Sequence, residues 1–135
     1  MTFSIAAVCP KSGDFGVAVS SSSICVASRC AFVRRDSGAA LSQNITDPTL
    51  GTTLLDLCAN GLSADEALQK LIAEQPHIEY RQLAVIDKSS RAAAHTGSEA
   101  LGISAQAIGQ HAVAIGNLLA NDAVSYTHLT LPTKA

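Results

Sequence analysis

The sequence predicts an α+β domain in which helices cover a face of an antiparallel sheet. Residues 3–8 and 15–19 are rich in strand-forming side chains and flank the turn cluster Pro10-Lys11-Ser12-Gly13, which predicts a β-hairpin. Two helical patterns then follow each other directly, and short strand-like runs return after them. Because strands and helices are grouped and do not alternate, the pattern favours antiparallel strands over a parallel α/β sheet.

The two helices are predicted by their apolar spacing and by their end signals. Residues 49–60 place leucines on one helical stripe ahead of Gly61, which is suited to the left-handed position that ends a helix. Residues 64–75 form a second amphipathic pattern, which opens with Ser63 and Glu66 at capping-box spacing. The two segments therefore predict a consecutive pair of helices.

The remaining strands are predicted from short runs of β-forming residues. Residues 38–42 form one run, residues 82–87 and 91–95 flank a polar turn and predict a second hairpin, and residues 111–115 precede Gly116. Between the first of these runs and the helices stand Gln43, Asn44 and Asp47. One interpretation has Gln43 and Asn44 line a pocket, and the other, which we favour, has Asp47 simply cap the following helix.

Length and composition exclude several classes of function. The chain has 135 residues, of which 47% are hydrophobic, enough for one domain with a buried core. Its formal net charge of -2 and its lack of any Lys/Arg run exclude a basic patch, so neither nucleic acid nor an anionic membrane is an expected partner. The N-terminal segment has no basic leader and no long apolar stretch, which predicts a cytoplasmic protein without a membrane anchor.

The cysteines and glycines give no sign of a metal or cofactor. Cys9, Cys25, Cys30 and Cys58 lack the spacing of a zinc ligand set, and we interpret them as reduced, mostly buried thiols. The glycines form no phosphate-cradling motif. One alternative stays open, because Arg29 stands beside Cys30 and a neighbouring guanidinium lowers a thiol pKa, which favours a cysteine nucleophile.

The last residues differ in character from the rest of the chain. The segment VSYTHLTLPTKA is rich in Thr and shows no helical period. Codons for residues 124–133 can be written GTC TCT TAT ACA CAT CTG ACG CTG CCG ACG, which resembles a transposon-type sequencing adapter in frame, and the preceding adapter bases fit a GCT codon for Ala123. We therefore expect residues 1–123 to be a partial domain without its natural C-terminal part, and residues 124–135 to be an artefactual tail.

Thr2 is the candidate nucleophile. Removal of Met1 before a small residue would expose a free α-amine beside the Thr2 hydroxyl, so that nucleophile and base share one residue. An α-amine has a reference pKa of roughly 7.7–8.0, so a sizeable neutral fraction exists near neutral pH to accept the hydroxyl proton. Because Thr2 leads directly into the first hairpin, we expect it at a sheet end and not in a free tail.

An ordered set of segments resembles a known bacterial family. TFSIAAVCPKSGDFGVAVSSSS, GLSADEALQKLIAEQP, YRQLAVID, AAAHTG and AIGNLLAND follow one another as in domain of unknown function 1028. That family is assigned to the N-terminal-nucleophile (Ntn) hydrolase superfamily. The resemblance implies a four-layer αββα sandwich with antiparallel sheets, here incomplete, and hydrolysis of the amide bond of a small molecule. Self-association into a homo-oligomer is expected by analogy with the superfamily's flat helical layers.

The resemblance also assigns site residues. Thr2 takes the place of the superfamily's first residue, while Ser20 and Arg35 stand where proteasome-like relatives carry an acid and a base. Arg35 cannot accept a proton, but its positive charge would lower the proton affinity of the Thr2 amine. Asn117 follows a predicted strand, and its amide is expected to donate to a developing oxyanion near Thr2. The His95 and His111 side chains are interpreted as packed strand residues.

Two functions of different classes follow. The first is an amidohydrolase in which Thr2 attacks a small amide with its own amine as base. The alternative is a non-catalytic ligand-binding or assembly module on the same fold, favoured by the missing carboxylate and Lys partners. We expect Asn117 and either Arg34 or Arg35 to approach Thr2 if the first is right.

Overall fold

The computed structural model of the chain describes residues 1–129. Two antiparallel sheets of four strands each run in the order β2-β1-β8-β7 and β3-β4-β5-β6. The strands are β1 (Thr2–Val8), β2 (Phe15–Ser21), β3 (Ala31–Arg34), β4 (Gly38–Asn44), β5 (Arg81–Asp87), β6 (Ala92–Thr96), β7 (Ala105–Ile108) and β8 (Ala112–Asn117). The helices of the described residues are α1 (Ala27–Cys30), α2 (Pro48–Ala59), α3 (Ala64–Glu74) and α4 (Ala123–Leu129), with the 3-10 turn η1 (Ile78–Tyr80).

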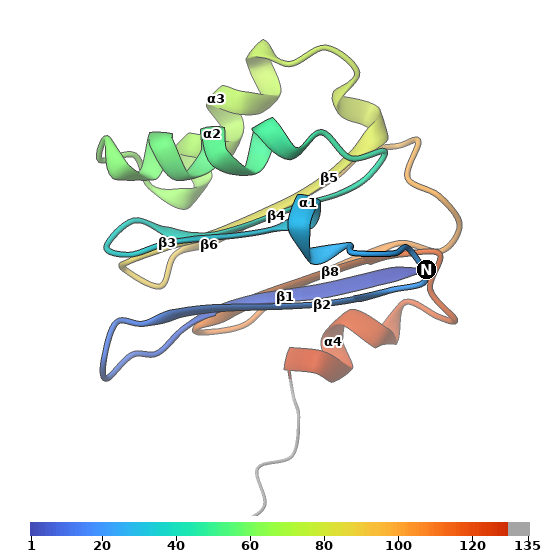
Figure 1. Cartoon of the computed structure of the whole chain (residues 1–135), viewed down its shortest axis with the longest axis horizontal. Coiled ribbons are helices and arrows are strands. Elements are labelled where there is room, and N and C mark those ends of the chain that lie inside the picture. The colour runs from blue at the N-terminus through green and yellow to red at the C-terminus, as the bar shows by residue number, and fades with distance from the viewer. Residues whose placement is uncertain (130–135) are drawn as a thin grey trace, which may run out of the picture.

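The elements are arranged in layers. Figure 1 shows α2 and α3 above the sheet that contains β4 and β5, the two sheets face to face, and α4 below the sheet that contains β1 and β8. The prediction of mixed helices and antiparallel strands, with the consecutive helix pair over one sheet face, is confirmed. In the part of the chain that the structure describes, no helix has the length and apolar character needed to span a bilayer.

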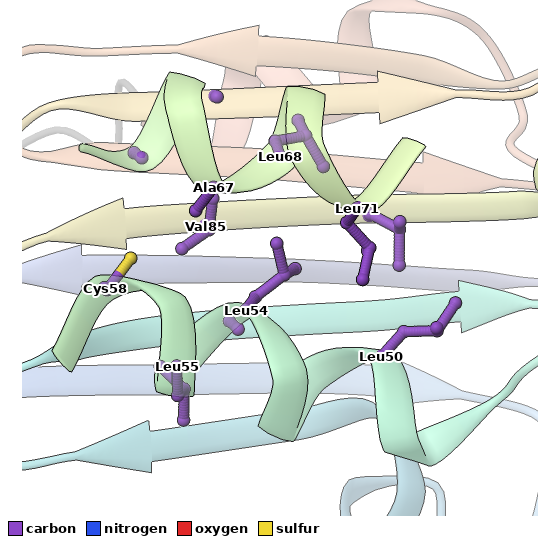
Figure 2. Close-up of a cluster of buried hydrophobic side chains, with 12 residues drawn as sticks. Leu50, Leu54, Leu55, Cys58, Ala67, Leu68, Leu71 and Val85 are labelled. Atoms are coloured by element: carbon purple, nitrogen blue, oxygen red, sulfur yellow. The ribbon is translucent and has the colours of Figure 1, made fainter. Parts of the chain in front are cut away.

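One core lies between the helix pair and its sheet. Leu54 of α2 and Leu68 and Leu71 of α3 are buried against Val85 of β5, as Figure 2 shows. Full burial of a Leu or Val side chain contributes about 1.5–3 kcal/mol relative to exposure. The 3.6-residue spacing of these leucines is the signal that predicted the two helices.

The second core lies between the sheets and changes character along the strands. Its apolar part includes Val8, Leu41, Ile86 and Ile115, which come from both sheets. Toward the end of the sandwich where β1 begins, the inward positions become polar, and Gln43 is only 1% exposed. Burying a polar side chain costs free energy unless the side chain is hydrogen-bonded. We therefore expect a site at this polar end of the sandwich.

The predicted helix caps are confirmed. Asp47 accepts a hydrogen bond from the Thr49 backbone N–H at 3.0 Å and caps α2. Ser63 and Glu66 form the reciprocal capping box of α3. A further cap comes from far along the chain, because the buried Asp87 carboxylate accepts from the Ala64 N–H at 2.9 Å.

We expect Asp87→Ala to destabilise the fold by about 2 kcal/mol. The same carboxylate also accepts from the Ser89 and Arg91 backbone N–H groups and pairs with the Arg91 guanidinium at 3.0 Å, so its loss leaves several donors without an acceptor. The measurement is the urea unfolding midpoint of the 135-residue chain. Asp56→Ala is the matched control, because it breaks an ion pair with Arg34 in which Asp56 is 60% exposed, and such pairs contribute at most about 1 kcal/mol. Equal midpoints for both variants would contradict the capping role.

The structure differs from the sequence prediction at short elements. Residues 24–28 lead into the single turn of α1, which the sequence did not predict, and there Arg29 and Cys30 donate their backbone N–H groups to the Val26 carbonyl. The four-residue strands β3 and β7 were not predicted, since runs of that length carry little periodicity.

The predicted lack of a helical period after Ala123 is wrong for residues 123–129, which form α4. Ser125 is 1% exposed, and its hydroxyl donates to the Ala105 carbonyl at 3.3 Å. The outer face of β7 and β8 carries only small residues under this helix, which lets its backbone approach closely. Packing does not test the foreign origin of residues 124–135, which stays a prediction. Residues 130–135 of this expected tail lie outside the described residues.

The outer face of β2 is open to solvent. Gly16, Ala18 and Ser20 are exposed there, and the neighbouring hollow of about 120 Å³ is lined in part by Phe3 and Ile5 of β1. Within the described residues, helices therefore cover only part of the outer face of this sheet.

Candidate functional site

Thr2 opens β1 at one end of the space between the sheets. It lies opposite Ser21 of β2 and Asn117 of β8, so the three side chains share the inner face of their sheet. The hydroxyl oxygens of Thr2 and Ser21 are 2.8 Å apart. The Met1 carbonyl accepts from the Ser22 N–H at 3.2 Å. The predicted position of Thr2 at a sheet end is confirmed.

A cleft of about 360 Å³ opens beside Thr2. Its volume falls within the range of small-molecule sites, which are usually about 300–1,000 Å³. Its walls come from the start of β1, the segment around α1, and the end of β4 with the loop that follows: Thr2, Ser23, Val26, Arg29, Cys30, Gln43, Asn44, Ile45 and Thr46. Gln43 and Asn44 line this cleft although Asp47 also caps α2, so the two interpretations of this segment do not exclude each other.

A buried polar network lies behind the cleft and joins the two sheets. Ser4 donates to Gln43 Oε1 at 2.6 Å, and Gln43 Nε2 donates to Gln82 Oε1 at 2.9 Å. Gln82 Nε2 in turn donates to the Gly116 carbonyl at 2.8 Å, and Asn117 Nδ2 donates to Gln82 Oε1 at 3.3 Å. Each glutamine thus fixes a group of the opposite sheet, and the network holds Asn117 on the inner face beside Thr2.

Asn44 shapes the rim of the cleft. Its backbone is left-handed, with φ of 78°, a region that Asn tolerates better than most residues. Its side-chain amide donates to the Tyr80 carbonyl at 2.7 Å, and its oxygen accepts from the Leu101 N–H at 3.0 Å. The turn that ends β4 is therefore tied to two loops that are distant in sequence.

Arg29 is the cationic residue of the cleft, and the sequence analysis did not place it near Thr2. Its Nη1 donates to the carbonyls of Ile24 and Cys25 at 2.9 and 3.4 Å. No carboxylate within residues 1–129 lies in ion-pair distance of Arg29, whereas Arg34, Arg35 and Arg91 each have one. The only sequence signal for this residue was its place beside Cys30.

Two predicted neighbours of Thr2 lie elsewhere. Ser20 pairs with Phe3, one residue out of phase with Thr2, and its side chain is therefore on the outer face of the sheet. Arg35 lies in the β3–β4 turn with a 95% exposed side chain, beside a pocket that it shares with Ser12 of the β1–β2 turn. Figure 1 shows both turns at the opposite end from the N-terminus, and the seven residues of β1 span roughly 20 Å. The expected approach of Arg35 or Arg34 to Thr2 is wrong.

His95 and His111 do not line the cleft. His95 Nε2 is 3.1 Å from the Ile78 carbonyl, and His111 Nδ1 is 3.0 Å from the Ser90 hydroxyl. Their interpretation as packed residues fits these local contacts.

Comparison with known proteins places the chain in a family. The model of the family of unknown function DUF1028 matches residues 2–130. The chain belongs to DUF1028. A crystal structure of the DUF1028 protein SPO2555 from Silicibacter pomeroyi superposes with a TM-score of 0.93 at 28% sequence identity, covering 99% of this chain and 63% of that chain. A search of curated proteins finds no match.

This DUF1028 chain spans less than two thirds of the length of the Silicibacter protein. The predicted family is confirmed, and its description carries no reaction. Among the described residues, no group of three His, Cys, Asp or Glu side chains is arranged to hold a metal ion.

The cysteine alternative is corrected at Cys30. Burial raises the pKa of the Cys30 thiol, and this effect exceeds the lowering by the neighbouring Arg29 charge and by the Thr46 hydroxyl. Burial likewise raises the pKa of Cys58 to about 11. Neither thiol is therefore activated as a nucleophile at neutral pH.

We expect Cys9 to be alkylated far faster than Cys30 and Cys58. Cys9 is exposed in the β1–β2 turn, where hydrogen bonds from Ser12 lower its pKa. Thiolate is the reactive form, so a lowered pKa gives more of it at neutral pH. The measurement is site-resolved mass spectrometry after iodoacetamide treatment at several pH values, with urea-unfolded chain as the control for intrinsic reactivity. Preferential labelling of Cys30 in the folded chain would restore the thiol as a candidate nucleophile.

Proposed function

We propose that this chain carries the site of an Ntn-type amidohydrolase, with Thr2 as nucleophile after removal of Met1. The observation that supports this proposal best is that Thr2, the second residue of the chain, begins β1 on the inner face and lines the cleft. The order of layers, with helices outside two facing antiparallel sheets, resembles the Ntn-hydrolase sandwich. The substrate is a small molecule, and the reaction needs no cofactor.

The proposed reaction has two steps. Thr2 Oγ1 attacks the amide carbonyl carbon, while its proton passes to the Thr2 α-amine and then to the leaving nitrogen as the C–N bond breaks. The products of this step are a Thr2 ester and a free amine. Water then attacks the ester carbonyl, releases the acid and returns the proton to the Thr2 hydroxyl.

Neighbouring groups suit this chemistry. Asn117 donates one Nδ2 hydrogen to Gln82 Oε1. Its second Nδ2 hydrogen can donate to the oxyanion formed at the attacked carbonyl. The Ser21 hydroxyl, 2.8 Å from Thr2 Oγ1, can orient the nucleophile or relay its proton. In this proposal Ser21 and Arg29 take the places that the sequence analysis gave to Ser20 and Arg35.

One observation favours the alternative, a non-catalytic binding module. Among residues 1–129, neither a carboxylate nor a lysine lines the cleft, so the only base that these residues place beside Thr2 would be its own amine. Retention of Met1 would block that amine and leave a ligand-binding cleft. A cytoplasmic location and self-association stay predictions under either function.

The test combines intact-mass analysis with a hydrolysis screen. We expect Met1 to be absent from the protein made in a bacterial host, and the processed chain to hydrolyse a member of a panel of N-acyl amino acids and their anilides. Thr2→Ala should reduce the rate to the uncatalysed level, and Thr2→Ser should retain part of it. Because the base must be the neutral amine, the rate should rise with pH through a value of roughly 8.

Ser20→Ala is the matched control, because it removes a hydroxyl from the same hairpin on the outer face. It should leave the rate unchanged. Retained Met1, or equal rates for Thr2→Ala and the unmodified chain, would refute the nucleophile assignment and favour the binding module.

A further inference from the structure

The cleft beside Thr2 carries a positive charge, and no carboxylate of the described residues lines the cleft to compensate it. Arg29 is the charged residue among the lining side chains, and the others are neutral hydroxyl, amide, thiol or aliphatic groups. An arginine stays protonated at every physiological pH. A neutral ligand would leave that charge without a partner.

The guanidinium of Arg29 is positioned and still has donors free. Nη1 is fixed by the carbonyls of Ile24 and Cys25. Nε and Nη2 have no hydrogen-bond partner among residues 1–129. These two nitrogens lie along one edge of the guanidinium plane, the edge that binds a carboxylate through two parallel hydrogen bonds.

Nearby charges do not compensate this edge. Asp47 follows the cleft residue Thr46, but its carboxylate is turned to the start of α2, where the hydrogen bond from Thr49 holds its pKa below the usual value. Arg81 donates from Nη1 to the Ile45 carbonyl at the cleft wall and has no carboxylate within ion-pair distance in the described residues. Asp47 and Arg81 are near enough for their charges to interact and offset each other, so Arg29 is the cation that attracts an anion to the cleft.

We propose that the ligand of this cleft is an amide that also carries a carboxylate, and that Arg29 binds the carboxylate while the amide lies at Thr2. The inference rests on the proposed function for the position of the amide, and on the lining charge for the carboxylate. Val26 and Ile45 supply an aliphatic wall beside these groups. N-acyl amino acids are the simplest members of this class.

The test is a binding comparison between N-acetylglycine and N-acetylglycinamide, which differ in charge and little in size. Both are titrated by NMR into the Thr2→Ala chain, in which no turnover occurs. We expect N-acetylglycine to bind at least about tenfold more tightly, the usual effect of a charge-assisted hydrogen-bonded pair. The preference should fall as salt is added, because a partly exposed ion pair is screened. Equal dissociation constants at low salt would overturn the proposal without the use of any Arg29 variant.

Variants of Arg29 and Arg35 show which residue causes the preference for N-acetylglycine. Arg29→Gln should abolish the preference, and Arg29→Lys should keep part of it, because lysine retains the charge without the two-pronged edge. Arg35→Gln is the matched control, since it removes the same charge at the far end of the sandwich and should change nothing. Thermal melting of each variant checks that the segment around Ile24 stays folded. A preference that survives Arg29→Gln in a folded chain, or that Arg35→Gln removes equally, would assign the effect to overall charge.

The two proposals fail separately. If Thr2 proves necessary for hydrolysis but Arg29→Gln does not change the KM for a carboxylate-bearing amide relative to its neutral analogue, the anion inference is wrong and the hydrolase stands. If no amide is hydrolysed but N-acetylglycine binds in an Arg29-dependent way, the hydrolase is wrong and the cleft is an anion-binding site.

Discussion

Gly97→Ala is expected to destabilise the chain by about 3 kcal/mol or more, a large fraction of the stability of a small domain. Gly97 follows β6 and packs directly on the backbone of η1. A Cβ atom at this position would stand 2.0 Å from the Glu79 carbonyl oxygen and 2.6 Å from its Cα. Both neighbours are main-chain atoms, so no side chain can rotate to relieve the overlap.

Backbone hydrogen bonds also hold Gly97 close to Glu79, and moving the two segments apart would break them. The Gly97 N–H donates to the Arg81 carbonyl at 3.0 Å, and the Glu99 N–H donates to the Glu79 carbonyl at 2.9 Å. Gly16→Ala is the control, because a Cβ there meets no atom within 4 Å. The measurement is the urea midpoint of each variant with its m-value, and equal midpoints would show that η1 moves away at little cost.

The local elements could be predicted from the sequence because their signals are local. The leucine spacing and capping residues of α2 and α3 lie within the helices themselves. The β1–β2 hairpin is marked by its turn, and that alone placed Thr2 at a sheet end. Signals of this kind need no knowledge of what a segment packs against.

The neighbours of Thr2 depend on register, which the sequence did not resolve. The sequence alone does not distinguish Ser20 from Ser21, because both are serines at the end of the same predicted strand. A shift of one residue, however, moves a side chain to the other face of a sheet. Asn117 could be placed because it follows closely on the predicted strand 111–115, which pairs with β1. Its position opposite Thr2 follows from the pairing of β8 with β1, which residue composition does not reveal.

The cation of the site was misplaced for a related reason. The resemblance placed Arg35 at the site, because it stands where proteasome-like relatives carry a base, but the β3–β4 turn points to the far end of the sandwich. Arg29 belongs to the one-turn helix α1, which has no periodicity to detect. Short irregular segments contribute site residues that periodic signals do not reveal.

The glutamine pair behind the cleft was not predicted as a unit. Gln43 and Gln82 are 39 residues apart, and each alone resembles an ordinary polar residue in a strand. They are paired in register between β4 and β5, and only the facing of the two sheets brings them to Ser4 and Asn117. We infer that this network supports the site, which makes its central member the most informative residue to change.

Gln82→Leu is therefore expected to destabilise the fold by about 3 kcal/mol or more and to weaken the site as well. Leucine is similar in size, so the variant creates little cavity, but it leaves the Gln43 and Asn117 amide groups without their buried acceptor. Each buried polar group without a partner costs about 1–3 kcal/mol. With its acceptor gone, the Asn117 amide is no longer held beside Thr2.

The measurements are the urea midpoint and ligand binding of Gln82→Leu at a temperature where it is folded. Gln106→Leu is the matched control, because Gln106 is exposed on β7 and also bonds Thr96, yet within the described residues it has no hydrogen bond to Gln43 or Asn117. It should shift the midpoint by no more than about 0.5 kcal/mol. If Gln82→Leu lost stability but bound N-acetylglycine as tightly as the unmodified chain, the network would be a structural tie between the sheets and would not position the site.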